Sequence, residues 1–221
     1  MQTRESVKKR RTIRSFLPDP VSGDVIRELI SEARWAPSWG NTQPWEFMIV
    51  NGSAMENLKN KNRDALVSGV KPHPEIQMPE KFPEIHSSRY KDVGKSVLTS
   101  LSIPRRDLEA RMEYYGDMFH LFNAPALLLV LLDRNLLLEY TMLDVGLFLQ
   151  TFMLLACDRG LGTASLAASV NYPDVLREHL PIPEDKTIAI GVAVGWPDMD
   201  APVNRFERKR APIDEVTTWV E

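Results

Sequence analysis

The 221-residue chain has a single cysteine, Cys157, so it cannot form an intrachain disulfide bond. A chain of this length buries enough apolar surface to fold without a disulfide or a metal. Its cysteine content therefore favours a reducing compartment, and we expect a cytoplasmic protein. The N-terminal segment has basic residues but no apolar core of a secretory signal, which agrees with that expectation.

Long uncharged apolar runs are also scarce. The longest strongly apolar helix candidate has an uncharged stretch of 13 residues, from Val145 to Cys157. A membrane-spanning helix requires about 20 such residues. We therefore expect no membrane association.

The chain lacks the familiar catalytic and metal-binding motifs. Its four histidines show no HExxH or other ligand spacing, so no metal is expected. There is no GxSxG or Walker A sequence, and Cys157 falls in an apolar helix, where a small buried residue is the ordinary interpretation. The sequence offers no nucleophile or acid–base pair of its own. If the protein is an enzyme, a cofactor carries the chemistry.

Positive charge, in contrast, is concentrated at both ends of a chain whose net charge is −3. Five cations lie within seven positions near the N-terminus, namely Lys8, Lys9, Arg10, Arg11 and Arg14, and a second group contains Arg205, Arg208, Lys209 and Arg210. Arginine matches phosphate with fixed paired donors. Cations about 4 Å apart repel by roughly 4 kcal/mol at an effective dielectric near 20, so convergence makes sense only around an anion. From charge alone, two independent solvated tails are an equally good interpretation.

A nucleic-acid partner is not expected from this charge distribution. The basic cluster fits the loose pattern of a nucleic-acid patch, but the isoelectric point of the whole chain is near 5.9. A nucleic-acid-binding domain usually presents a basic face overall.

Hydrophobic patterns predict alternating helices and strands, which is typical of a layered α/β or α+β domain. Helices are predicted over 20–37, from 53 onward, over 105–121 and over 140–162, the last being apolar almost all round and ended by Gly160 and Gly162. Strands are predicted over 45–52, 124–133 and 186–197. Residues 70–90 contain four prolines and no sustained periodicity, so they are either a binding lid or a passive surface insertion.

The stretch "ARWAPSWGNTQPWEF", 33–47, joins the first predicted helix to the first predicted strand. Its small polar residues are flanked by indole rings, an arrangement suited to holding a planar polar ring. An ordinary capped loop remains the simpler interpretation of this segment alone.

Four separated segments resemble the FMN-dependent nitroreductase family. "RRTIRSF" is similar to its opening motif and "APSWGNTQPWEF" to its QPW segment. "LDVGLFLQTFMLLACDRGLGT" resembles its central helix and the following loop, and "GWPDMDAPVNRFERKRAPIDEVTTW" its C-terminal arginine segment. The most similar branch is the 4-nitrobenzoate-reductase-like one, and the likeness extends from Arg10 to Trp219 with 70–105 the least similar part.

The resemblance implies an α+β nitroreductase-like fold, with a central, mostly antiparallel sheet surrounded by helices and an intertwined homodimer. It implies one FMN-binding domain over residues 1–221, with a variable excursion at about 65–122. Two FMN molecules would lie at the subunit interface, and NADH or NADPH would be the electron donor, with no basis for choosing between them.

The resemblance also implies which residues bind FMN. Arg10, Arg208 and Arg210 would hold the phosphate with Arg11 and Thr12 nearby, and Arg205 is a competing candidate for this role. Arg14 would reach the N1/O2 edge of the flavin and tune it. Pro37, Ser38, Trp39 and Asn41 would contribute from the partner chain, with Gln43 a secondary candidate. Ser165, Leu166 and Ala167 would lie under the N5/O4 edge.

One departure from the family lies in this last group. The branch commonly has Cys-Pro-Gln where this chain has Ala164-Ser165-Leu166. A side-chain amide is thereby lost, so hydrogen bonding near N5 is expected from the backbone of Leu166 and Ala167.

The function implied is the reduction of nitroaromatic or similar planar, electron-poor small molecules with NAD(P)H by a ping-pong mechanism. Two alternatives remain open. A flavin-dependent reductive dehalogenase would use an ordered lid to grip its substrate, and a non-enzymatic flavin-binding protein would fail to oxidise NAD(P)H.

Overall fold

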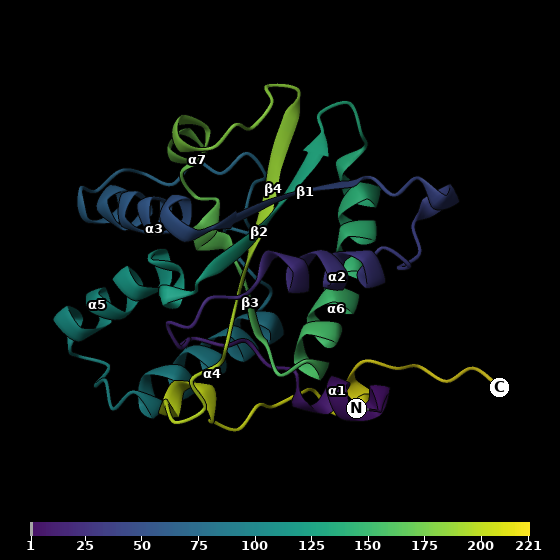
Figure 1. Ribbon diagram of the computed structural model, residues 1–221. Coiled ribbons are helices and arrows are strands. Elements are labelled where there is room, and N and C mark those ends of the chain that lie inside the picture. Colours follow the sequence, from purple (N-terminus) through teal and green to yellow (C-terminus); the bar gives the residue numbers. More distant parts are fainter. Residues whose placement is uncertain (1) are drawn as a thin grey trace.

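A four-stranded antiparallel sheet forms the centre of the computed structural model, which describes residues 2–221 (Figure 1). The strands are β1 (Trp45–Asn51), β2 (Ala126–Asp133), β3 (Gly162–Leu166) and β4 (Lys186–Gly195), in the spatial order β1-β2-β4-β3. The three strands expected from the sequence are confirmed. β3 was not predicted, since its segment was interpreted as a loop: its short Gly-Thr-Ala-Ser-Leu sequence has little intrinsic strand preference and depends on pairing with β4.

β2 is buried on both faces, as its continuous apolar run predicts. Alternate residues of β2 point into two different hydrophobic clusters. One cluster is completed by α2 (Gly23–Ala33) and α6 (Leu138–Asp158), and the other by α3 (Gly52–Val67) and α7 (Pro173–His179). The sheet therefore lies between two helical layers, which is the expected α+β architecture (Figure 1).

α2 forms where its sequence pattern places it. The Ser22 hydroxyl accepts a hydrogen bond of 3.2 Å from the Asp24 N–H and caps the helix. Ile26, Leu29 and Ala33 fall on one face of the helix and are buried against the sheet, so the predicted helix is confirmed. The helix ends at Ala33, which leaves residues 34–44 as the connection to β1.

α6 runs from Leu138 to Asp158, and its end differs from the prediction. Gly160 turns the chain with a φ of +79°, but Gly162 is the first residue of β3 and does not belong to the helix end. The helix is long and apolar enough to cross a membrane by length and composition. However, Phe148 and Phe152 on one side of it pack in the core, so it is a core helix with a second, exposed apolar side.

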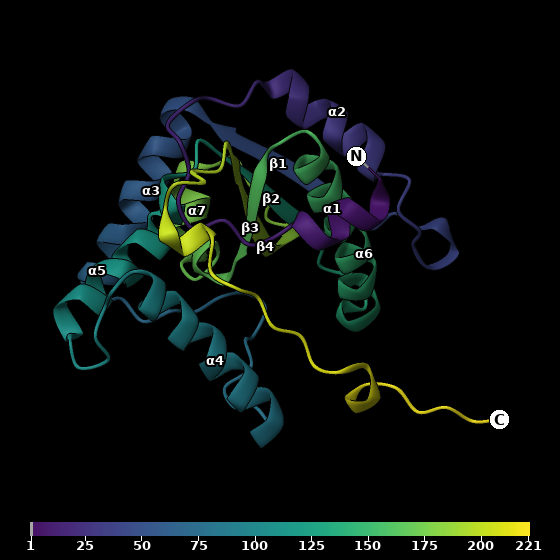
Figure 2. The same ribbon diagram turned by 90° about the horizontal axis from the view of Figure 1, so that it is seen from below.

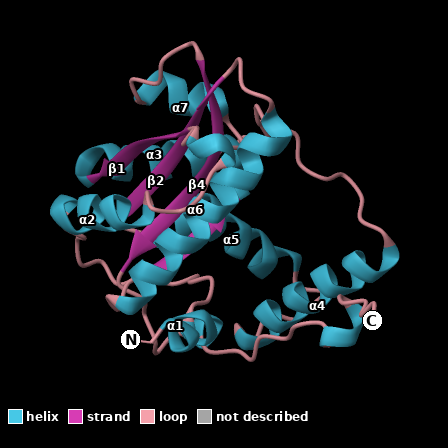
Figure 3. Ribbon diagram, turned by 90° about the vertical axis from the view of Figure 1, so that its right-hand side faces the viewer, coloured by secondary structure: helices cyan, strands magenta, loops and turns pink. Residues whose placement is uncertain are grey.

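The segment between α3 and β2 contains more helix than expected. Residues 68–83 are irregular, but α4 (Glu84–Ser100) begins inside the stretch predicted to be irregular, and α5 (Leu108–Phe119) follows. α4 lies away from the sheet (Figure 3), and Val97 is its buried residue. It therefore lacks the apolar stripe by which a helix is recognised in a sequence. The remaining helix, α1 (Thr3–Lys9), was also not predicted.

Glu75 fastens the irregular segment to the end of the sheet. Its Oε1 accepts hydrogen bonds from Arg177 at 2.7 and 2.8 Å, and its Oε2 accepts one of 2.8 Å from the Ile188 N–H. Ile188 adjoins an irregularity in the β2–β4 register, where the partner of Val130 is Ile190 and that of Leu131 is Ile188. Glu75 therefore needs both carboxylate oxygens as acceptors, one for Arg177 and the other for the Ile188 N–H.

We expect Glu75→Gln to lower the free energy of unfolding by about 2 kcal/mol, because an amide supplies one acceptor and turns a donor toward the other partner. For a chain of this size the melting temperature should fall by about 4–8 °C, which thermal denaturation measures. The exposed Glu80 in the same segment provides the matched variant, Glu80→Gln, which should melt like the unaltered protein. Equal melting temperatures for both variants would contradict this role of Glu75.

Candidate functional site

The segment 10–16 lies along the edge of the sheet and is anchored by two buried apolar side chains. Ile13 and Phe16 point inward, and the Ile13 N–H donates a hydrogen bond of 3.0 Å to the Thr163 carbonyl. A Cβ on Gly162 would stand 2.6 Å from Ile13 Cγ1, so a glycine is required there for close approach. Arg10, Arg11, Thr12 and Arg14 are thereby fixed beside β3.

The C-terminal segment meets this edge through Asn204, which is fully buried. Its Oδ1 accepts a hydrogen bond of 2.7 Å from the Arg14 N–H, and its Nδ2 donates to the Ser15 carbonyl at 2.8 Å. The Arg11 guanidinium donates to the Asn204 carbonyl. Asn204 thus joins the two ends of the chain. Sequence reasoning missed it, although it stands within the quoted C-terminal segment "GWPDMDAPVNRFERKRAPIDEVTTW".

Arg208 reinforces the junction. Its guanidinium donates hydrogen bonds to the backbone carbonyls of Lys8 and Arg10, which lie about 200 positions away in sequence. Arg205 instead donates to the Asp200 carbonyl at 2.8 Å and does not line the neighbouring cavity. Of the two competing candidates, Arg208 is therefore the one that lies beside Arg10.

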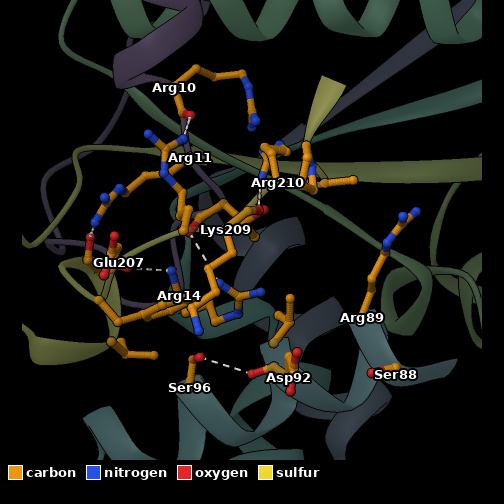
Figure 4. Close-up of a pocket in the computed structure, with 18 of the residues that line it drawn as sticks. Arg10, Arg11, Arg14, Ser88, Arg89, Asp92, Ser96, Glu207, Lys209 and Arg210 are labelled. Atoms are coloured by element: carbon orange, nitrogen blue, oxygen red, sulfur yellow. Dashed lines mark hydrogen bonds between the residues drawn. The ribbon is translucent and has the colours of Figure 1, made fainter. Parts of the chain in front are cut away.

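A cavity of about 660 Å³ opens where the two chain ends meet (Figure 4). One wall consists of the basic residues of both ends, and α4 supplies the opposite wall with Ser88, Asp92 and Ser96. The helical form of this wall was not anticipated, because that part of the sequence gave no periodic signal. The predicted site residues on the basic wall are Arg10, Arg11, Thr12, Arg14, Arg208 and Arg210.

These arginines are close enough to affect one another. Burial, followed by the charge of Arg210, lowers the pKa of Arg10. Burial, followed by the charges of Arg11, Arg10 and Arg210, lowers the pKa of Arg208. Within residues 2–221, no carboxylate forms an ion pair with any of them. A dianionic phosphate in the cavity would remove this repulsion and accept the donors, so the residues present fit that group.

Arg14 extends from the same edge toward aromatic side chains. Its guanidinium carbon lies 5.7 Å from the centroid of the Phe206 ring, which is a cation–π distance. Burial raises the pKa of the nearby Tyr114, while the charge of Arg14 opposes that rise. Arg14 is thus held at a defined place in the cavity wall.

Ser165, Leu166 and Ala167 lie at the end of β3, and the side chains of Ser165 and Ala167 are exposed. β3 is an edge strand, and Thr163 forms a bridge with Thr12. The structure therefore brings these residues to the same sheet edge as the segment 10–14.

The segment 37–43 lies elsewhere. The Trp39 N–H donates to Asp144 in the first half of α6, whereas Arg10 is close to Cys157 near the end of α6. Asp144 and Cys157 are 13 residues apart on this helix, which corresponds to about 20 Å. Pro37, Ser38, Trp39, Asn41 and Gln43 are thus separated from the basic wall within one subunit.

The exposed side of α6 is apolar in the first half of the helix, around the attachment of Trp39 to Asp144. Leu143 is 60% exposed, and Tyr140 and Leu147 are exposed beside it. Trp39, at 63% exposure, lies against Tyr140 with ring centroids 4.4 Å apart. A contiguous apolar surface of this kind is typical of a protein–protein interface.

The residues of the cavity offer no metal site. Among residues 2–221, no group of three or more His, Cys, Asp or Glu side chains is placed to hold a metal ion. Cys157 is partly buried, and burial raises the pKa of its thiol. It is therefore mainly protonated and a poor nucleophile.

The sequence and the fold of this chain are similar to those of known proteins. The model of the nitroreductase family matches residues 7–196. A nitrobenzene nitroreductase of Ectopseudomonas oleovorans is 34% identical over 222 residues, which cover 97% of this chain and 95% of the relative. A solved FMN- and NADPH-dependent nitroreductase, NfnB from Sphigopyxis sp. strain HMH, has a TM-score of 0.95 and 29% identity with complete coverage of both chains. NfnB of Mycobacterium smegmatis, solved with NADPH, has a TM-score of 0.92 and 27% identity, covering 100% of this chain and 99% of that one.

Proposed function

The chain belongs to the nitroreductase family, and we propose that it is an FMN-dependent oxidoreductase that reduces nitroaromatic compounds with NADPH or NADH. The observation that carries the proposal is the convergence of arginines from both chain ends on one cavity, where within residues 2–221 none of these arginines forms an ion pair with a carboxylate. FMN supplies the redox chemistry between the nicotinamide and the nitro group.

Arg10, Arg208 and Arg210 hold the phosphate in this proposal, and Arg11 and Thr12 support them. Arginine suits this role because its forked donors pair with two phosphate oxygens at once. Arg14 would face the flavin ring, where a fixed cation would favour negative charge near N1 and O2. Backbone groups of Leu166 and Ala167, next to the exposed Ser165, would hydrogen-bond the other edge of the ring.

The active form in this proposal is a homodimer that pairs the exposed sides of two α6 helices. The separation of about 20 Å along α6 means that the segment 37–43 of one subunit is too far from that subunit's own basic wall. An antiparallel pair of α6 helices would bring the segment 37–43 of one subunit to the basic wall of the other. Each flavin site would then be built from both subunits, and donor and acceptor would use the same space in turn.

The test is an absorption spectrum followed by a steady-state assay. We expect protein that has been incubated with FMN and desalted to stay yellow and to oxidise NADPH or NADH in the presence of nitrobenzene. Colourless protein would contradict the proposal. Yellow protein without NAD(P)H oxidation would favour a flavin-binding protein, and release of halide from a halophenol without nitrobenzene turnover would favour a reductive dehalogenase.

A further inference from the structure

The segment 37–43 has an unusual and well-defined backbone. Gly40, Asn41 and Gln43 have φ values of +55°, +58° and +48°, and the last two are in a region that residues other than glycine seldom adopt. Internal hydrogen bonds maintain this shape, because the Gln43 N–H donates to the Ser38 hydroxyl at 2.9 Å and the Asn41 N–H to the Ser38 carbonyl at 3.0 Å. Such a conformation persists only when its surroundings hold it.

Asp144 of α6 supplies one attachment of this segment to the body of the protein. Both of its carboxylate oxygens accept from the Trp39 N–H, at 3.1 and 3.2 Å, across 105 positions of sequence. The Trp39 ring packs on Tyr140, one helical turn before Asp144. Both contacts come from α6, the helix with the exposed apolar side.

Burying the carboxylate of Asp144 at this position costs free energy. Asp144 is only 5% exposed, and a buried carboxylate loses most of its hydration. Within residues 2–221, the structure gives it no cationic partner. An apolar side chain would pack there without that cost, so what the carboxylate adds is its hold on the first N–H of the 3₁₀ turn Trp39–Asn41.

We propose that Asp144 is a positioning residue: it locks the segment 37–43 onto α6 and so places the polar groups of that segment against the flavin of the partner subunit. This inference rests on the proposed function. It links the dimer surface to the flavin site, because α6 carries both the apolar side that contacts the partner subunit and the carboxylate that positions the segment 37–43.

The experiment compares Asp144→Ala, which removes both acceptors, with Asp144→Asn, which keeps one in the same shape. FMN dissociation constants and the visible circular dichroism of the bound flavin are measured on dimeric holoprotein. We expect Asp144→Ala to weaken FMN binding about tenfold and to change the dichroism, and Asp144→Asn to stay within about threefold. Asp19→Asn, which changes an exposed carboxylate outside α6, is the control and should match the unaltered protein in both readouts.

A merely structural role would lower the melting temperature and leave the dichroism of the bound flavin unchanged, and this result would overturn the proposal. An unaltered protein that binds no FMN would instead refute the proposed function. The two failures are therefore distinguishable in one set of measurements.

A second pair of variants covers the case in which Asp144→Ala does not fold. Trp39→Ala and Trp39→Pro both lose the indole, but only proline removes the N–H that Asp144 binds. Ser38 is extended, with φ −142° and ψ 160°, which suits a following proline. We expect Trp39→Pro to bind FMN about fivefold or more weakly than Trp39→Ala. Equal affinities would overturn the role of Asp144.

Discussion

An Arg208→Ala variant is expected to lose most of its affinity for FMN, with little change in its affinity for riboflavin, which lacks the phosphate. A charge-assisted hydrogen bond contributes about 1.5–3 kcal/mol, and Arg208 also fixes the backbone of Lys8 and Arg10. A loss of about 2 kcal/mol raises the dissociation constant for FMN by roughly 30-fold. Fluorescence titration of the apoprotein with each flavin measures both constants.

Arg205→Ala is the informative comparison, because Arg205 belongs to the same segment but bonds to Asp200 outside the cavity wall. Its FMN affinity should remain within about twofold of that of the unaltered protein. Arg208→Lys keeps the charge but loses the forked donors, so an intermediate affinity is expected. FMN binding by Arg208→Ala that equals that of the unaltered protein would rule out this arginine as a phosphate ligand.

A Leu143→Glu variant is expected to be monomeric and to bind FMN at least about 100-fold more weakly, which corresponds to about 2.8 kcal/mol. Leu143 is exposed in the subunit, but in the proposed dimer it lies between two α6 helices. A buried carboxylate without a partner there would prevent association. Loss of the partner would also remove the segment 37–43 from the flavin site. Sedimentation velocity and FMN titration measure the two effects together.

Leu108→Glu makes the same change at an exposed leucine on α5, where a carboxylate in the first helical turn is favourable. This control should remain dimeric and bind FMN normally. A Leu143→Glu protein that is still a dimer would place the interface elsewhere. A monomer with unchanged FMN affinity would refute the contribution of the partner subunit to the site.

Elements whose patterns are continuous could be predicted from the sequence. β2 has an unbroken apolar run and is buried on both faces, and α2 combines a serine cap with an apolar face. Such elements are specified by their own residues. The antiparallel arrangement of the strands, in contrast, was implied only by the family resemblance.

Elements that depend on a neighbour could not be predicted in this way. β3 is defined by its pairing with β4 and by the bridge from Thr12, neither of which is visible in five consecutive residues. α4 buries little beyond Val97, so its sequence lacks helical periodicity. That this part of the cavity wall is a helix therefore became apparent only from the three-dimensional structure.

The candidate site illustrates the same limit. The sequence reveals two groups of arginines, but charge alone does not decide whether they meet. The contacts of Asn204 show that the two groups meet, since its buried amide joins Arg14 and Ser15 to the C-terminal segment. Beyond Arg210 the chain leads away from the sheet, and Trp219 is exposed near its end (Figure 2). That course is what the proposed intertwined dimer requires.

The most direct test of the central claim is the ratio of the dissociation constants of riboflavin and FMN for the unaltered apoprotein. If guanidinium groups from both chain ends hold one flavin phosphate, two charge-assisted contacts of about 1.5 kcal/mol each should make FMN bind roughly 150-fold more tightly than riboflavin. Equal affinities for the two flavins would contradict the claim.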